Sequence, residues 1–119
     1  GYTYSAHPVA CAVALKCIEI QEEEGLLARA TAIGERLAAG LRAMLDEGLL
    51  IDVRGEGAVW GISVPDGVEV VAVRDALLQE GVIIRPIPPN HMSMCPPLVI
   101  SDEQIDKIVT SLRKVLTAE

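Results

Sequence analysis

Residues 51–64 read Ile-Asp-Val-Arg-Gly-Glu-Gly-Ala-Val-Trp-Gly-Ile-Ser-Val and contain two strand patterns on either side of a glycine-rich turn. The first strand is expected at Ile51–Arg54, and Gly55-Glu56-Gly57 is expected to form a turn or a bulge. Because side chains alternate between the faces of a strand, the second strand presents one apolar face. That face consists of Ala58, Trp60, Ile62 and Val64. A sheet with one apolar face needs helices to cover it, which predicts an α+β domain.

Helical patterns precede these strands. Pro8 suits the first position of a helix, because its missing N–H is not needed there. The segment Val9–Ile20 that follows is apolar on nearly every face, and we therefore expect a helix buried between two packed bodies. A second helix is expected at Leu26–Glu47, with one apolar stripe and a stop at Gly48.

The sequence after the two strands predicts further helices and strands. Val70–Glu80 is expected to be a helix, Val82–Arg85 a strand, and Pro86–Asn90 a loop. Met92–Cys95 is expected to add an edge strand. Ser101-Asp102-Glu103-Gln104 has the pattern of a capping box and predicts the start of a final helix. The elements form a small antiparallel or mixed sheet with helices over one face.

Composition narrows the classes of partner. The chain has 119 residues, enough for one domain, and a formal net charge of −7. Nucleic acids and anionic membrane surfaces select for clustered Lys and Arg, so we expect neither as a partner. No apolar run is long enough to cross a bilayer without charges. Half of the residues are hydrophobic, which indicates either an extra buried face against another domain or subunit, or an ordinary domain rich in alanine and leucine.

The cysteines Cys11, Cys17 and Cys95 are odd in number and show no CxxC spacing. Cys11 and Cys17 lie within the apolar helical pattern, so they are interpreted as small core residues in a reducing compartment. A cytoplasmic location follows from this interpretation. His7 and His91 are far apart and have no accompanying ligand pattern, so a zinc site is not expected.

Three segments resemble one family in order and spacing. The first is Gly-Tyr-Thr-Tyr-Ser-Ala-His-Pro-Val-Ala-Cys-Ala at 1–12, and the second is Val-Arg-Gly-Glu-Gly-Ala-Val-Trp-Gly-Ile at 53–62. The third combines Gly-Val-Ile-Ile-Arg-Pro at 81–86 with Cys-Pro-Pro-Leu-Val-Ile-Ser at 95–101. Together they resemble the class III (ω-) aminotransferases, which depend on pyridoxal 5'-phosphate (PLP).

The resemblance implies a carboxy-terminal segment of a fold-type I enzyme. Residues 1–25 are then the end of a large domain, with a cofactor-phosphate loop and a long connecting helix, and residues 26–119 are the small domain. The implied assembly is a homodimer with a shared active site. It moves an amino group from an amine or ω-amino acid to a 2-oxo acid. The lysine that forms a Schiff base with the cofactor belongs to the large domain, so this segment alone is expected to contain no catalytic residue and to be inactive.

Residue by residue, the resemblance assigns Thr3 to the cofactor and Arg85 to the substrate. The Thr3 hydroxyl is expected to donate to the phosphate of PLP bound by the partner subunit, with the backbone amide of Tyr2 beside it. The local sequence by itself favours a loop cap such as an ST-turn, and the family match favours the phosphate. The planar guanidinium of Arg85 suits a substrate carboxylate. The alternative is an ordinary surface arginine or an internal ion pair. The proline-rich loop at 87–91 departs from the family pattern, which bears on how far Arg85 can move.

Trp60 stands where the family more often has an aliphatic residue, and we expect it to be a packing anchor. Two other functions remain open at this stage. The same fold and cofactor serve aminomutases, racemases and decarboxylases, and a non-catalytic α+β binding or dimerisation module fits the elements equally well.

Overall fold

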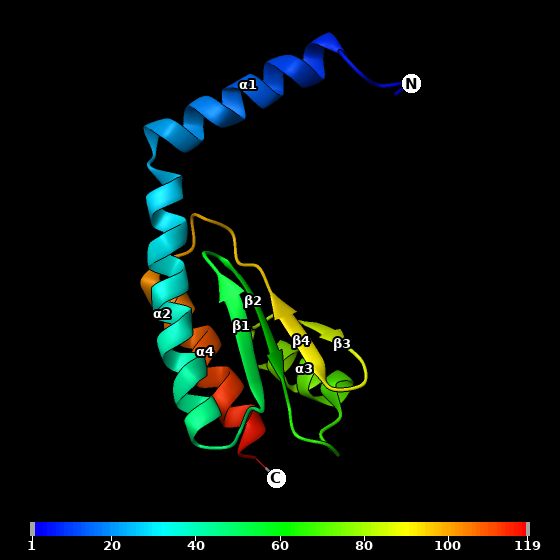
Figure 1. Ribbon diagram of the computed structural model, residues 1–119, viewed down its shortest axis with the longest axis vertical. Coiled ribbons are helices and arrows are strands. Elements are labelled where there is room, and N and C mark those ends of the chain that lie inside the picture. Colours follow the sequence, from blue (N-terminus) through cyan, green and yellow to red (C-terminus); the bar gives the residue numbers. More distant parts are fainter. Residues whose placement is uncertain (1, 119) are drawn as a thin grey trace.

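The computed structural model describes residues 2–118, whose helices and strands form an α+β fold (Figure 1). In chain order the elements are α1 (Pro8–Glu23), α2 (Leu26–Asp46), β1 (Asp52–Glu56), β2 (Val59–Ser63), α3 (Val70–Gln79), β3 (Arg85–Ile87), β4 (His91–Met94) and α4 (Asp102–Leu116). The α+β prediction is confirmed.

The four strands form one antiparallel sheet in the order β1-β2-β4-β3. Trp60 lies opposite Met94, and Ile62 lies opposite Met92. Opposed residues of antiparallel strands share a face, so these four side chains point to the same side of the sheet. All four are buried.

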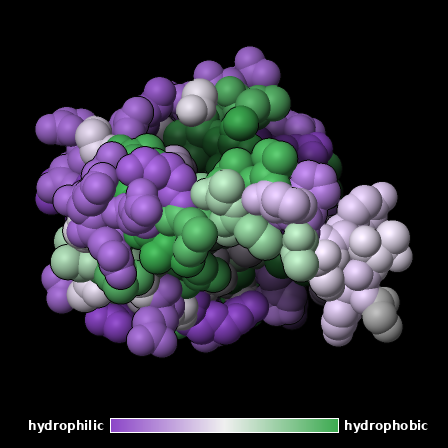
Figure 2. Space-filling model, turned by 90° about the horizontal axis from the view of Figure 1, so that it is seen from above, coloured by the Kyte–Doolittle hydropathy of each residue, from purple (hydrophilic) through white to green (hydrophobic). Residues whose placement is uncertain are grey.

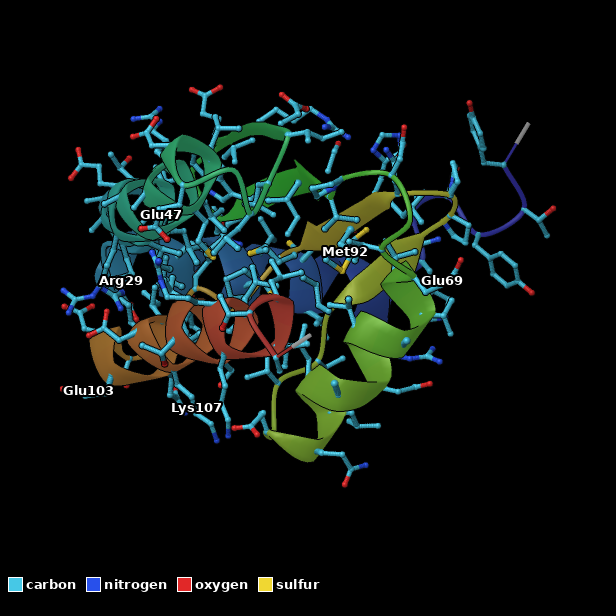
Figure 3. The ribbon with its side chains drawn as sticks, turned by 90° about the horizontal axis from the view of Figure 1, so that it is seen from below. Arg29, Glu47, Glu69, Met92, Glu103 and Lys107 are labelled. Atoms are coloured by element: carbon cyan, nitrogen blue, oxygen red, sulfur yellow. The ribbon has the colours of Figure 1, made fainter. Side chains whose placement is uncertain are left out.

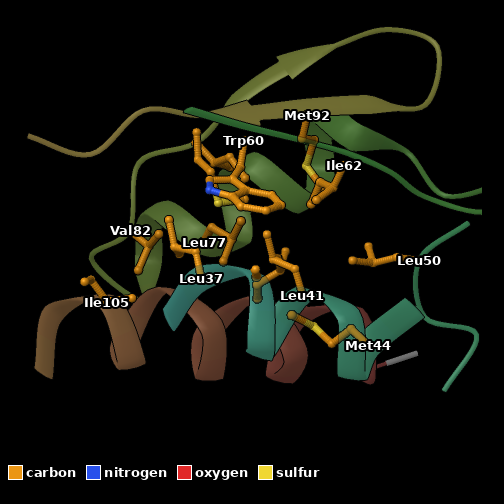
Figure 4. Close-up of a cluster of buried hydrophobic side chains, with 14 of the residues drawn as sticks. Leu37, Leu41, Met44, Leu50, Trp60, Ile62, Leu77, Val82, Met92 and Ile105 are labelled. Atoms are coloured by element: carbon orange, nitrogen blue, oxygen red, sulfur yellow. The ribbon is translucent and has the colours of Figure 1, made fainter. Parts of the chain in front are cut away.

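Helices α2, α3 and α4 cover that side of the sheet (Figures 1 and 4). Leu37 and Leu41 of α2 meet Leu77 of α3 and Ile105 of α4 in one core with the sheet residues. The expected apolar face of the second strand is confirmed, since Ala58, Trp60, Ile62 and Val64 are all buried. Within residues 2–118, no helix covers the opposite face of the sheet (Figure 1). The side chains of that face form one of the two candidate sites.

The helix α1 stands apart from this core. It extends from the start of α2 away from the sheet (Figure 1) and gives the chain an elongated shape of 53 × 31 × 24 Å. Hydrophobic side chains lie open along the end of the molecule where α1 runs (Figure 2). The expectation that this helix is buried on all sides is wrong for this chain, because no residue of α1 is buried. Cys11 and Cys17 are exposed for the same reason, and Cys95 is exposed too.

Two strand predictions were also wrong. The backbone N–H of Val82 donates to the carbonyl of Leu77 over 2.9 Å and completes the end of α3, so the strand begins at Arg85 instead of Val82. Pro86 is accommodated because β3 is an edge strand, where a missing N–H can face outward. The predicted edge strand, β4, lies inside the sheet between β2 and β3.

The start of α4 follows the sequence prediction closely. The hydroxyl of Ser101 accepts from the backbone N–H of Gln104 over 3.2 Å, and the side-chain oxygen of Gln104 accepts from the N–H of Ser101 over 3.0 Å. This reciprocal pair is a complete capping box. Within residues 2–118, no helix combines the length and the apolar character that a membrane crossing requires.

Candidate functional site

The N-terminal loop is a tight turn directly before α1. The backbone N–H of Ser5 donates to the carbonyl of Tyr2 over 3.1 Å. Ala6 has φ 59°, a left-handed conformation that is uncommon for a residue with a side chain. Thr3 lies inside this turn and is exposed. Nothing in the residue pattern indicates the left-handed backbone at Ala6, although such outliers often accompany functional loops.

His7 connects this loop to the helix. Its Nδ1 accepts from the backbone N–H of Ala10 over 3.3 Å, so His7 is the N-cap of α1, and Pro8 follows as the first helical residue. Because Pro8 has no N–H and the donor of Ala10 is already used, the helix end offers few donors to an external anion. This contact reduces the contribution that we expected from the helix N-terminus.

The hydrogen-bond donors that remain in this loop are suited to a phosphate site to which other residues also contribute. A threonine hydroxyl and the backbone amides of a tight turn can each donate to a phosphate oxygen. They supply no positive charge, so residues elsewhere must hold most of a phosphate dianion. Thr3 and Tyr2 can therefore form part of a phosphate site. The loop alone cannot form the whole site.

The second candidate site is the outward face of the sheet. Arg85 lies directly opposite Ser93, Ser93 opposite Gly61, and Gly61 opposite Arg54. These residues therefore form one row across all four strands on the face away from the helices. Arg85 is exposed, and within residues 2–118 no carboxylate lies within 4.0 Å of its guanidinium. The row places an arginine at each edge of the sheet.

A chain of hydrogen bonds runs beside this row. Arg54 binds the carboxylate of Asp52 and also donates to the Ser63 hydroxyl over 3.1 Å. Ser63 is in turn 2.8 Å from Nδ1 of His91. The sequence motifs do not reveal this network. The alternation of Asp52 and Arg54 along one strand would have placed them on one face, but their link to His91 depends on the pairing of β2 with β4.

Arg85 lies on the hairpin that β3 and β4 form. Beyond the ladder of β3 and β4, the backbone N–H of Val64 donates to the carbonyl of Asn90 over 2.9 Å, and the Asn90 side chain donates to the carbonyl of Val64 over 3.4 Å. These hydrogen bonds connect the end of the proline-rich loop to the segment that follows β2. Arg85 sits in a strand, so its reach is set by rotation of its own long side chain.

The lysines of the chain lie away from both candidate sites. Lys16 pairs with Glu19 on α1, and Lys114 pairs with Glu80. Lys107 projects from α4 on the side away from the sheet and packs beside Gly81 (Figure 3).

The structure does not bring the two candidate sites together. Thr3 lies beyond the far end of α1, and Arg85 lies on the sheet (Figure 1). Two hollows, of about 560 and 520 Å³, open beside α4 and beside α2, and neither is lined by Thr3 or Arg85. Each candidate residue thus faces away from the described part of the chain.

Comparison with known proteins identifies the architecture. The chain superimposes with a TM-score of 0.90 on the acetylornithine aminotransferase of Elizabethkingia anophelis, at 28% identity, over 100% of this chain and 31% of that one. It superimposes with a TM-score of 0.88 on the ω-transaminase of Pseudomonas jessenii in complex with PMP, at 29% identity, over 99% of this chain and 28% of that one. The fold is that of a segment of the fold-type I transaminases.

The sequence comparisons name the family. The profile of the class-III aminotransferases matches residues 1–116. The ω-aminotransferase of Caulobacter vibrioides is 33% identical over 98% of this chain and 27% of its own length, and ornithine aminotransferase 1 of Staphylococcus saprophyticus is 32% identical over 98% and 29%. The chain belongs to the class-III aminotransferase family, and it spans just under a third of the length of these relatives.

Proposed function

We propose that this chain is the carboxy-terminal part of a PLP-dependent aminotransferase that moves an amino group from an amine or ω-amino acid to a 2-oxo acid. The observation that carries the proposal is the family match over residues 1–116, joined to an exposed arginine on the helix-free face of the sheet. The names of the relatives, an ω-aminotransferase and an ornithine aminotransferase, support transamination over the other reactions of this fold and over a non-catalytic module.

In this proposal residues 1–25 complete a large domain and residues 26–119 are the small domain. The open apolar surface of α1 supports that division, because α1 has no buried residue in this chain and exposed apolar surface of this extent marks a contact face. We further propose a homodimer with a shared active site and a cytoplasmic location.

The residues of this chain then have defined tasks. Thr3 donates its hydroxyl, and Tyr2 its backbone amide, to the phosphate of the cofactor. Arg85 binds a substrate carboxylate through its two-pronged guanidinium. When bound, PLP supplies an electron sink for the bonds at the amino-bearing carbon. The lysine that holds the cofactor belongs to the remainder of the enzyme, because the lysines here lie on helix surfaces, two of them in ion pairs.

A product assay on the full-length enzyme tests this proposal. The expected result is formation of alanine from pyruvate, or of glutamate from 2-oxoglutarate, in the presence of an amino donor, together with the visible absorption of bound PLP. Full-length protein that binds no PLP would overturn the proposal. Decarboxylated, racemised or rearranged products without amino-group transfer would replace transamination by one of the related reactions.

A further inference from the structure

The outward face of the sheet contains a second polar group beside Arg85. Ser93 lies directly opposite Arg85 on β4, and directly opposed residues of an antiparallel pair have Cβ atoms about 5 Å apart. The hydroxyl of Ser93 makes no hydrogen bond to another group within residues 2–118. Within the described residues, the Ser93 hydroxyl is therefore available for a ligand, next to the Arg85 guanidinium, which has no carboxylate partner.

We infer that Ser93 is a specificity-determining residue, whose hydroxyl donates with the Arg85 guanidinium to one carboxylate of a dicarboxylate substrate. This inference rests on the proposed function. A carboxylate offers two oxygens with about four acceptor positions, so it can receive both groups at once. Cross-strand pairing supplies the necessary side-by-side arrangement without help from any other element.

The surroundings of Ser93 favour a negatively charged ligand. Its neighbour on β2 is Gly61, which has no side chain to cover it. The Arg54 side chain lies across Gly61, with Nε 3.5 Å from the position that a Cβ would take there. Ser93 therefore stands between the two arginines of one row, Arg85 on β3 and Arg54 on β1, and Arg54 is already paired with Asp52.

The backbone at Ser93 is held on both sides by strand pairing. Ser93 pairs with Gly61 on one side and Arg85 on the other. Two residues earlier, His91 is tied to the buried Ser63. Donors on rigid strands are positioned more accurately than donors on loops, and ordering them costs little entropy when the ligand binds.

Kinetics of the full-length enzyme test the inference. Ser93→Ala is expected to raise the KM for 2-oxoglutarate about tenfold, the usual effect of losing one hydrogen bond to a charged group, and to leave the KM for a primary amine without a carboxylate unchanged. Ser93→Thr keeps the hydroxyl and a strand-compatible side chain, and is expected to retain most of the affinity. Thr110→Ala is the matched control, since it removes a hydroxyl from the exposed side of α4.

A double variant separates ligand binding from a structural effect. In the Arg85→Ala background, loss of the Ser93 hydroxyl is expected to have a smaller effect on KM, because the carboxylate is no longer held against it. Ser93→Ala with wild-type kinetics, or with equal effects on amine and acid substrates, would overturn the inference while the proposed function stands. Succinate binding, measured by calorimetry, needs no turnover. If Ser93→Ala and Arg85→Ala both weaken it in a protein that does not transaminate, the carboxylate site survives and the proposed function fails.

Discussion

Thr3 and Arg85 differ in how their surroundings prepare them for a ligand. Arg85 is carried by a paired strand, so its backbone position is set by the sheet. Thr3 is carried by a turn of a few residues that is closed by one backbone hydrogen bond and joined to α1 through the cap at His7. A turn of this kind gains order from the ligand that it binds, so the effect of Thr3 is expected on cofactor retention more than on folding.

Thr3→Ala in the full-length enzyme is expected to weaken PLP binding about tenfold, because one hydrogen bond to a charged phosphate is lost. The measurement is dialysis against buffer without cofactor, followed by determination of the retained PLP. Thr3→Ser keeps the hydroxyl and is expected to retain PLP like the unmodified enzyme. Equal cofactor affinity in all three proteins would remove Thr3 from the phosphate site.

Trp60 acts on stability through its ring and its indole nitrogen. It is 6% exposed, and Nε1 donates to the carbonyl of Gly57 over 2.8 Å. Trp60→Ala is expected to lower the free energy of unfolding by about 3–5 kcal/mol because it leaves a cavity. Trp60→Phe keeps most of the packing and is expected to lose about 1–2 kcal/mol with the hydrogen bond.

Urea unfolding of the 119-residue chain measures these differences. The matched control is Val59→Ala, because Val59 is the next residue of β2 but faces outward and is 61% exposed. Its effect is expected to stay within about 0.5 kcal/mol. If Val59→Ala destabilised the chain as much as Trp60→Ala, the assignment of Trp60 as a packing anchor would be wrong.

At the scale of elements, α2 and α4 are joined by a charged network. Arg36 binds both carboxylate oxygens of Asp106 over 2.7 Å and reaches Asp102 over 3.3 Å, and Arg29 also binds Asp102 over 2.8 Å. The hydrogen bond from Arg36 lowers the pKa of Asp106 below its ordinary value, and the pKa of Arg36 is raised in turn. The pair therefore stabilises the contact between the helices in the charged form of both groups.

This network predicts a dependence of stability on pH. The pKa of Asp106 is lower in the folded than in the unfolded chain, so its contribution is fully present above the unfolded pKa of about 3.9 and is lost as the pH falls through the folded pKa. Asp106→Asn is expected to be less stable than the unmodified chain at neutral pH, with the difference shrinking below about pH 4. Urea unfolding at several pH values measures this trend.

Asp75→Asn is the control for this experiment, because Asp75 pairs with its exposed neighbour Arg74 on α3 and such surface pairs contribute little. A difference between Asp106→Asn and the unmodified chain that stayed constant down to pH 2 would show that the ionised carboxylate is not responsible for it.

The elements were predictable to different degrees, for physical reasons. The start of α4 depends on local hydrogen bonds within four residues, so the pattern at Ser101 and Gln104 was sufficient. The start of β3 depends on where α3 ends and on pairing with β4, and it was misplaced. That displacement matters for the candidate site, because the face on which Arg85 points, and its position opposite Ser93, follow from the register of the strands. The motifs identified Arg85, and only the fold identified its neighbours.

At the scale of the whole molecule, α1 differs from the rest of the chain in its burial. The sheet and the other helices share one core, and the predicted apolar face of the second strand lies in it. For α1 the same reasoning predicted burial, and the helix is exposed. An apolar helix can be buried only by a partner, and residues 2–118 provide none for α1.

This separation predicts that residues 26–119 fold without α1. No residue of α1 is buried, so its removal takes nothing from the core. The shortened chain is expected to unfold in urea at the same midpoint as the 119-residue chain and to elute as a monomer in size-exclusion chromatography with light scattering. The 119-residue chain is expected to elute above its mass of 12.7 kDa, because the exposed apolar side chains of α1 associate.

Substitution on α1 distinguishes this cause from association through the sheet. Leu15 and Ile18 are 63% and 52% exposed and lie on one side of the helix. The double variant Leu15→Gln and Ile18→Gln is expected to shift the 119-residue chain towards the monomer without changing the urea midpoint. In the full-length enzyme the same variant is expected to weaken assembly, since the proposed large domain and partner subunit need that surface. A shortened chain that is unfolded would show that α1 belongs to the folding unit, and the division at residue 25 would then be wrong.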